Sequence, residues 1–282
     1  MGTLVSIRVK GLPLAETHRA IDAAFNEVAT VHRFMSFHEA DSDVGRLNRA
    51  RAGQPVEVHP FTFDVLKCAL AIAASSDGCF DISVAAELVK WRLLPRPYGA
   101  AGSRRRPKGA WRDIELLPDG RVIFHRPLWV DLGGIAKGYA VDRATERLRA
   151  SGATQAVVNA GGDIRVMGRN AERIALELEF PLDPQPVLEL TEGSVASSSG
   201  HRHRRMNQGR VYGPHVHGVR RCAAPTDRFV CVVAECCIVA DALTKVVMAD
   251  GGHCADMLRE FNAAAHLHDP FEGWSHFGGK EA

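Results

Sequence analysis

Apolar and polar residues alternate along some stretches of the chain and follow a helical period along others. Alternation predicts strands at 3–9, 174–180 and 186–190, and runs rich in β-prone residues predict further strands at 121–130, 156–159 and 229–233. Apolar residues three or four positions apart predict helices at 15–35, 60–75, 138–151 and 238–250. Helices do not separate every pair of strands. The pattern therefore favours an α+β fold, with antiparallel or mixed sheets packed with helices, over a doubly wound parallel fold.

Two polar stretches interrupt these elements. Residues 95–113 contain Arg104-Arg105-Arg106 between glycines and prolines, which predicts a solvated basic loop. Residues 201–221 are rich in His, Arg and Gly, which predicts a long functional loop. No segment repeats with a period of about 20–50 residues. We expect one domain spanning residues 1–282.

Length and charge exclude several classes of protein. A chain of 282 residues buries enough surface for a large core without support from disulfides or metals. The net charge of +2 gives no global attraction to nucleic acid, so no nucleic-acid partner is expected. No apolar run reaches the roughly 18 residues of a membrane span. The opening MGTLVSIRVK lacks a basic segment followed by an apolar core, so no signal peptide is visible and a cytoplasmic location stays open.

The seven cysteines predict buried thiols. They are irregularly spaced, form no CxxC pair, and most have apolar neighbours. Histidine offers a rival function, because His201/His203, His215/His217 and His266/His268 are HxH pairs, and such a pair on a strand can hold zinc. No HExxH is present. A zinc hydrolase is therefore a minor alternative.

The segment from Val130 to Asp142 has the densest candidate chemistry. Its three glycines, Gly133, Gly134 and Gly138, let a ligand approach the backbone, and the turn opens a helix whose N–H groups favour phosphate. It is not a P-loop, because Lys137 precedes its glycine and no Ser or Thr follows. A glycine-rich turn without a ligand explains the segment equally well.

Three further elements are ambiguous when taken alone. Asn159-Ala160-Gly161-Gly162-Asp163 follows a predicted strand and is typical of a turn. Asp81, after Gly78-Cys79-Phe80, and Asp241, at the opening of an apolar helix, are more typical of helix caps than of ligands.

Taken in order, these elements resemble the FAD:protein FMN transferase family, also called the ApbE-type flavin transferases. The matching series is Met1-Gly2-Thr3, Met35-Ser36-Phe37, Ser42, Leu47-Asn48, Phe80-Asp81-Ile82-Ser83, Leu88 through Trp91, Asp131 through Asp142, Asn159 through Asp163, Ser197-Ser198-Ser199-Gly200 and Ala240-Asp241-Ala242-Leu243. The resemblance implies the ApbE-like architecture and an enzyme that binds FAD with Mg²⁺ and splits its pyrophosphate. It would attach FMN to a Thr or Ser of an acceptor flavoprotein and release AMP. A relative that binds or hydrolyses FAD without transfer is the alternative. Family members act outside the cytoplasmic membrane.

The resemblance also assigns roles to single residues. It implies FAD contacts for Met1, Phe37, Phe80, Asp81, Ile82, Asp131 and Lys137. It implies Mg²⁺ ligands in the carbonyl of Gly134, the carboxylate of Asp241, which is also assigned to catalysis, and the hydroxyl of Thr244. His215 is the expected general base, with His217 as the second choice.

Two of the chain's departures from the family pattern concern the expected base and the expected metal ligands. Tyr212-Gly213-Pro214-His215-Val216-His217-Gly218 keeps a histidine but lacks the usual Asp-Pro. Lys245 stands where a hydroxyl residue is expected, four positions after Asp241. Either Thr244 supplies the missing oxygen and Mg²⁺ dependence is kept, which we expect from the intact Asp241 and glycine turn, or the ammonium replaces the metal.

Overall fold

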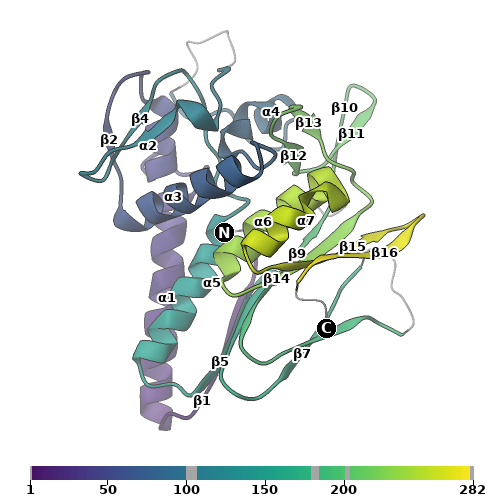
Figure 1. Cartoon of the computed structure of the whole chain (residues 1–282). Coiled ribbons are helices and arrows are strands. Elements are labelled where there is room, and N and C mark those ends of the chain that lie inside the picture. The colour runs from purple at the N-terminus through teal and green to yellow at the C-terminus, as the bar shows by residue number, and fades with distance from the viewer. Residues whose placement is uncertain (1, 100–106, 179–183, 201–203, 280–282) are drawn as a thin grey trace.

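The centre of the molecule is a seven-stranded sheet (Figure 1). The computed structural model describes residues 2–99, 107–178, 184–200 and 204–279. Each neighbouring pair in the sheet is antiparallel, in the order β1-β5-β6-β9-β14-β15-β16. The strands are β1 (Val5–Lys10), β5 (Gln155–Ala160), β6 (Asp163–Met167), β9 (Gly193–Ser199), β14 (Phe229–Ala234), β15 (Ala264–Asp269) and β16 (Gly273–Gly278).

The helices lie on one side of this sheet, some packed on its strands and others lying beyond these. They are α1 (Leu14–Met35), α2 (Asp43–Arg49), α3 (Pro60–Ser75), α4 (Ala85–Lys90), α5 (Ala136–Ala150), α6 (Cys237–Asp250) and α7 (Ala255–Glu260), with the short 3₁₀ turns η1 (Ile82–Val84), η3 (Trp111–Asp113) and η4 (Gly251–Cys254). Figure 1 shows α1 and α5 running side by side, with α6 across the sheet. The predicted α+β class with antiparallel sheets is confirmed. No described helix is both long and apolar enough to span a membrane.

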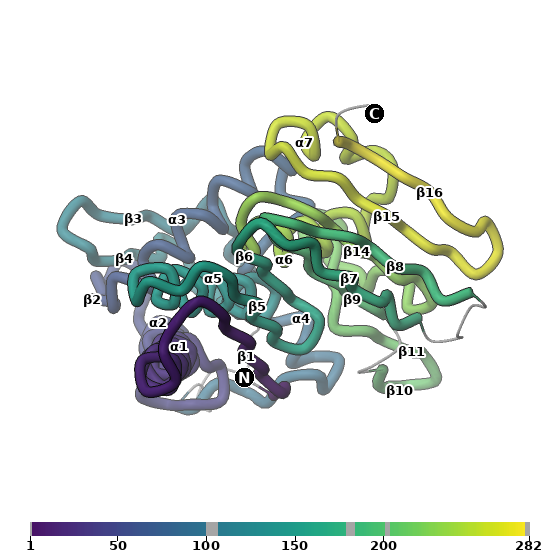
Figure 2. Tube along the Cα trace, turned by 90° about the horizontal axis from the view of Figure 1, so that it is seen from below, coloured from purple at the N-terminus to yellow at the C-terminus, as the bar shows by residue number. Residues whose placement is uncertain are grey.

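The strands of the sheet bury side chains on both faces. In β14, Val230 and Val232 belong to the main core under the helices, whereas Phe229 and Cys231 belong to a second apolar cluster. A two-stranded ribbon, β7 (Glu172–Ala175) with β8 (Val187–Leu190), adds Ile174 to that second cluster. Figure 2 shows this ribbon running beside the sheet strands in the view from below.

Three small sheets complete the fold. One contains β2 (Val56–Glu57), β3 (Ile114–Leu116) and β4 (Arg121–Phe124); the others are β10 (Arg205–Asn207) with β11 (Arg210–Tyr212), and β12 (Val216–His217) with β13 (Cys222–Ala223). The predicted loop at 201–221 is therefore wrong for 205–212, which form a hairpin, and for β12, whereas residues 213–215 and 218–221 are irregular or form a turn. Of the predicted basic loop at 95–113, residues 107–110 are irregular and 111–113 form η3, while the Arg104–Arg106 run lies outside the described residues.

Helices α5 and α6 approach closely at Gly138. A Cβ added there would lie 2.2 Å from the carbonyl oxygen of Cys237 and 2.8 Å from the Cα of Ile238. The N-terminus of α6 is capped from α5, because both oxygens of Asp142 accept backbone N–H groups, from Cys237 at 2.9 Å and Ile238 at 2.8 Å. The interpretation of Asp241 as a helix cap was therefore wrong: α6 begins four residues earlier, and a neighbouring helix supplies its cap.

Candidate active site

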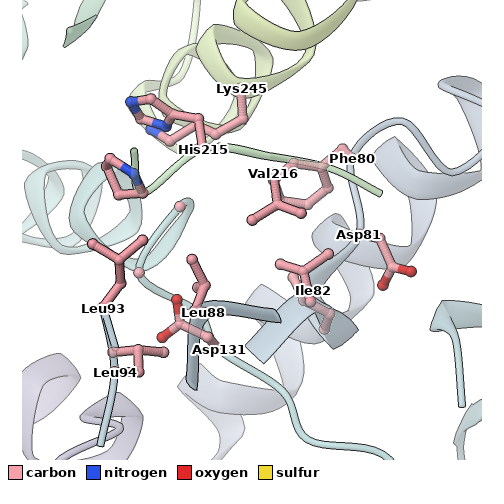
Figure 3. Close-up of a pocket in the computed structure, with 14 residues that line it drawn as sticks. Phe80, Asp81, Ile82, Leu88, Leu93, Leu94, Asp131, His215, Val216 and Lys245 are labelled. Atoms are coloured by element: carbon pink, nitrogen blue, oxygen red, sulfur yellow. The ribbon is translucent and has the colours of Figure 1, made fainter. Parts of the chain in front are cut away.

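A cavity of about 190 Å³ forms where four distant segments meet. They are the stretch 80–94, which follows α3 and includes α4, residues 131–134 before α5, residues 214–216 at the start of β12, and Lys245 on α6. Figure 3 shows His215 and Lys245 at one side of the space, with Asp131 and Leu94 at the other. Two parts of the matching series, at 80–82 and 131–134, thus meet the expected base His215 and Lys245 at one place in the fold.

Backbone and amide hydrogen bonds hold the segments together. The N–H of Asp131 donates to the carbonyl of Ile82 at 2.9 Å. The side chain of Asn48 binds both backbone groups of Val130, at 2.7 and 2.9 Å, which fixes the approach to the glycine turn. Gly218 donates to the carbonyl of Cys79 at 2.9 Å, so the histidine-bearing loop is tied to the segment after α3.

A second cavity of about 500 Å³ adjoins the first. The two share Leu94, Asp131 and Gly133 in their walls. The second is also lined by Phe37 and by Lys137 in the first turn of α5. Its volume falls in the range of about 300–1,000 Å³ that is typical of small-molecule sites. Together the two cavities form a site whose two parts meet at Asp131 and the glycine turn.

Four charged side chains form a buried cluster beside the cavities. Lys137 binds Asp163, and Lys245 binds Asp241. The ammonium of Lys137 also lies 3.8 Å from Asp241, which joins the two pairs. Both carboxylates are fully buried, and the backbone N–H of Gly138 donates to Asp241 at 3.1 Å. The charges of the cluster balance, which is the condition for stable ionised groups in a protein interior.

The cluster changes the protonation of its members. Burial alone would raise the pKa of Asp241, but Lys137 and Lys245 outweigh burial and hold that pKa below its usual range. Burial would lower the pKa of Lys137, yet Asp241 and Asp163 raise it instead. Burial and the nearby Asp241 raise the pKa of Asp163 to about 6, against the opposing effect of Lys137. Asp241 and Lys137 are therefore charged near neutral pH.

Lys245 reaches four oxygen atoms. It binds the carboxylate of Asp241, the carbonyl of Asp241 at 3.0 Å, the hydroxyl of Thr244 at 3.0 Å and the hydroxyl of Ser198 at 3.3 Å. Thr244 and Ser198 are themselves 2.8 Å apart. These oxygens come from α6 and β9, so the ammonium links the helix to the sheet.

His215 lines the smaller cavity, whereas His217 is not among the residues that line it. Burial and the nearby Lys245 lower the pKa of His215 to about 3, so the imidazole is neutral near neutral pH. A hydrogen bond with the backbone of Ser199 holds the ring. His217 is buried, and its Nδ1 accepts the backbone N–H of Arg220 at 3.4 Å. The geometry favours His215 over His217 as the base, and its role stays a prediction.

The residues expected to contact FAD fall into three groups. Phe80, Ile82 and Asp131 line the smaller cavity, and Phe37, Lys137 and again Asp131 line the larger one. Asp81 also borders the smaller cavity, but its carboxylate binds Arg221 at 2.7 Å and the backbone N–H of Ser83 at 2.7 Å. Figure 3 shows this carboxylate turned away from the space between Asp131 and His215. Met1 lies outside the described residues.

Sequence reasoning did not identify several partners of these residues. Arg221 neutralises Asp81 from 140 positions away. Ser198, quoted only as part of a serine run, binds Lys245. Leu93 and Leu94 are two adjacent apolar residues after α4, and both line the smaller cavity. No local pattern marks such residues, because each acts through a contact that only the folded chain creates.

The donor set assigned to Mg²⁺ does not fit a divalent ion. The Asp241 carboxylate and the Thr244 hydroxyl already bind the Lys245 ammonium, and the stem of Lys245 packs over Gly134, 3.4 Å from where a Cβ would lie. A Mg²⁺ ion would need oxygens at about 2.0–2.1 Å in near-octahedral geometry. Within the described part of the chain, no group of three or more His, Cys, Asp or Glu side chains could hold a metal. The part of the chain that the structure describes therefore gives the zinc alternative no support, and the pair His201/His203 lies outside that part.

Comparison with known proteins identifies the family of the chain. The profile of the ApbE family matches residues 1–267. The chain belongs to the ApbE family. It is 26% identical over 267 residues to an FAD:protein FMN transferase of Vibrio cholerae, covering 89% of this chain and 79% of that protein. It is 27% identical over 292 residues to the enzyme of the same name from Treponema pallidum, covering 93% and 80%.

A third relative and two solved structures agree with the family. The chain is 29% identical over 227 residues to an FAD:protein FMN transferase of Rhodobacter capsulatus, covering 76% of this chain but only 43% of that protein. The ApbE protein of Thermotoga maritima superimposes with a TM-score of 0.81 at 23% identity, covering 98% of this chain and 94% of that one. The flavinyl transferase ApbE of Pseudomonas stutzeri gives 0.73 at 21% identity, covering 99% and 95%. The ApbE fold of the chain is thus shown.

Proposed function

We propose that this ApbE-family protein transfers FMN from FAD to a Thr or Ser hydroxyl of an acceptor flavoprotein and releases AMP. The observation that carries the proposal is the pair of adjoining cavities joined at Asp131 and the glycine turn, with ammonium groups beside them. FAD is a long molecule with aromatic groups at its two ends and a pyrophosphate between them. The two cavities suit the ends, and cations suit the middle.

The proposed step is a displacement at phosphorus. The acceptor hydroxyl oxygen bonds to the FMN-side phosphorus while the bond from that phosphorus to the AMP oxygen breaks, and AMP leaves with both electrons of the broken bond. His215 takes the proton of the hydroxyl. A neutral imidazole is the base form, and the negative charge of a bound pyrophosphate would raise the pKa of His215 from about 3 toward the useful range. Asp131 and Phe37 position the flavin nucleotide.

Mg²⁺ forms no part of this proposed step. The resemblance to the family implied the ion, with Gly134, Asp241 and Thr244 as ligands, but the ammonium of Lys245 occupies the last two. The positive charge that phosphoryl transfer requires is therefore assigned to protein side chains.

The experiment incubates the protein with FAD and a bacterial flavoprotein that carries a candidate Thr or Ser, then measures acceptor mass and AMP. The expected result is one added FMN moiety on the acceptor and equimolar AMP, abolished when the acceptor hydroxyl residue is changed to Ala. A loss of about 10²–10⁴-fold in rate is expected for His215→Ala, with FAD affinity nearly unchanged. His217→Ala is the matched control and should retain activity. AMP without acceptor labelling would instead identify the protein as an FAD-hydrolysing relative.

A further inference from the structure

The ammonium of Lys245 lies where the smaller cavity meets the buried ion cluster (Figure 3). Its side chain is only 15% exposed, and its stem passes over Gly134. Lys245 therefore lines the cavity next to the glycine turn. This is the position that the family resemblance assigned to a divalent cation.

The oxygens around Lys245 are arranged for an ammonium. An ammonium has three N–H donors, and four oxygens from Asp241, Thr244 and Ser198 surround it, so every donor has an acceptor. The separations of 3.0–3.3 Å to the carbonyl and the two hydroxyls are those of N–H···O contacts. A divalent ion at this place would have to displace the ammonium from its carboxylate.

The charge balance points the same way. Lys137 and Lys245 together neutralise Asp163 and Asp241. A divalent cation added here would face two ammonium groups at short range, in surroundings that screen charge poorly. A pyrophosphate oxygen would instead meet the N–H donors of an ammonium that keeps its ion pair with Asp241. The 3.3 Å contact of Lys245 with Ser198 is its longest, and a phosphate oxygen can replace that hydroxyl without breaking the ion pair.

We propose that the ammonium of Lys245 takes the place of the divalent cation as the counter-charge for the FAD pyrophosphate, so that this chain binds FAD without Mg²⁺. The inference rests on the proposed function, because it takes FAD as the ligand. Asp241 then acts as a positioning residue: it holds the ammonium and does not bind metal. We therefore expect FAD binding that does not depend on Mg²⁺, in place of the Mg²⁺ dependence that the sequence predicted.

The test measures binding, so it does not depend on turnover. FAD is titrated into the full chain by fluorescence, in excess chelator and again in Mg²⁺, and the melting temperature is recorded with Mg²⁺ alone. The expected dissociation constants agree within about two-fold, and Mg²⁺ alone leaves the melting temperature unchanged. Lys245→Met should weaken FAD binding about ten- to hundred-fold in chelator, the loss expected for one charge-assisted contact. Lys67→Met is the matched control: it removes an exposed cation on α3 that lines neither cavity, and this variant should bind FAD normally.

Lys245→Thr gives a second, independent readout. It removes the ammonium and restores a hydroxyl at the position where the family pattern has one. FAD binding by this variant should become sensitive to chelator, and Mg²⁺ alone should raise its melting temperature. If the unaltered protein loses FAD affinity in chelator, or is stabilised by Mg²⁺ alone, the lysine proposal fails while the transferase proposal stands. If the protein binds no FAD under either condition, both proposals fail.

Discussion

Replacing Gly138 by Ala tests whether the contact between α5 and α6 positions the site. In most helices this change is stabilising by about 1 kcal/mol, because Ala has the higher helix propensity. Here the new Cβ would lie 2.2 Å from the oxygen and 2.6 Å from the carbon of the Cys237 carbonyl, and 2.8 Å from the Cα of Ile238. All three are backbone atoms, so no side-chain rotation relieves the clash. The two helices must move apart.

The expected magnitude follows from these opposing effects. Overpacking a tight interior costs up to about 3 kcal/mol, and the gain in propensity offsets about 1 kcal/mol of it. A net loss of about 2 kcal/mol lowers the melting temperature by about 4 °C in a chain of this size. Separation of the helices also weakens the bond from the Gly138 N–H to Asp241, so FAD affinity should fall as well.

Thermal melting and FAD titration of the same preparation check both expectations. Arg147→Ala is the control, because Arg147 is exposed on the same helix and its replacement should change stability by less than about 0.5 kcal/mol. A melting temperature equal to or above that of the parent protein would show that the backbone clash is absorbed at no cost. The argument for a fixed α5–α6 distance would then be refuted.

Two further predictions concern single residues of the cavities. Asp131→Ala should weaken FAD binding about ten-fold with little change in melting temperature, because Asp131 lines both cavities. Unchanged FAD affinity with a lower melting temperature would show that Asp131 is a structural cap instead. His215 should make the protein less stable as the pH falls from about 6.5 toward 3, because its pKa is about 3 when folded and the unfolded chain gains the proton first. Urea unfolding across that pH range should show a shallower decline for His215→Asn, and identical profiles would contradict the assigned pKa.

Long periodic elements could be predicted from the sequence, whereas short ones could not. The helix predicted at 60–75 matches α3, because Pro60 begins it and the apolar period persists throughout. The hairpin of β10 and β11 was mistaken for a loop, since strands of three residues are too short to show alternation. Its turn, Gln208-Gly209, has positive φ at both positions, and a glutamine gives little indication of that conformation.

The ion cluster shows the corresponding limit for the site. Asp241 and Lys245 lie four residues apart on α6, so their contact could be anticipated from the spacing alone. Lys137 and Asp163 come from other elements, and only the packing of α5 and β6 against α6 brings them within reach. All four residues lie in segments that the sequence analysis singles out. It could not show that they neutralise one another, which is the fact that decides between lysine and metal.

The glycine-rich segment from Val130 to Asp142 has two structural roles, and both roles determine the spacing of its glycines. Its first part, with Asp131, Gly133 and Gly134, lines the cavities. Its second part begins one helical turn later: Gly138 admits the backbone of α6, and Asp142 caps that helix. Because α6 carries Asp241 and Lys245, the second part sets where the ammonium lies relative to the first. A cation built on a helix side chain depends on this distance more than a free ion does, since an ion can shift with its ligands and a lysine is fixed to its backbone.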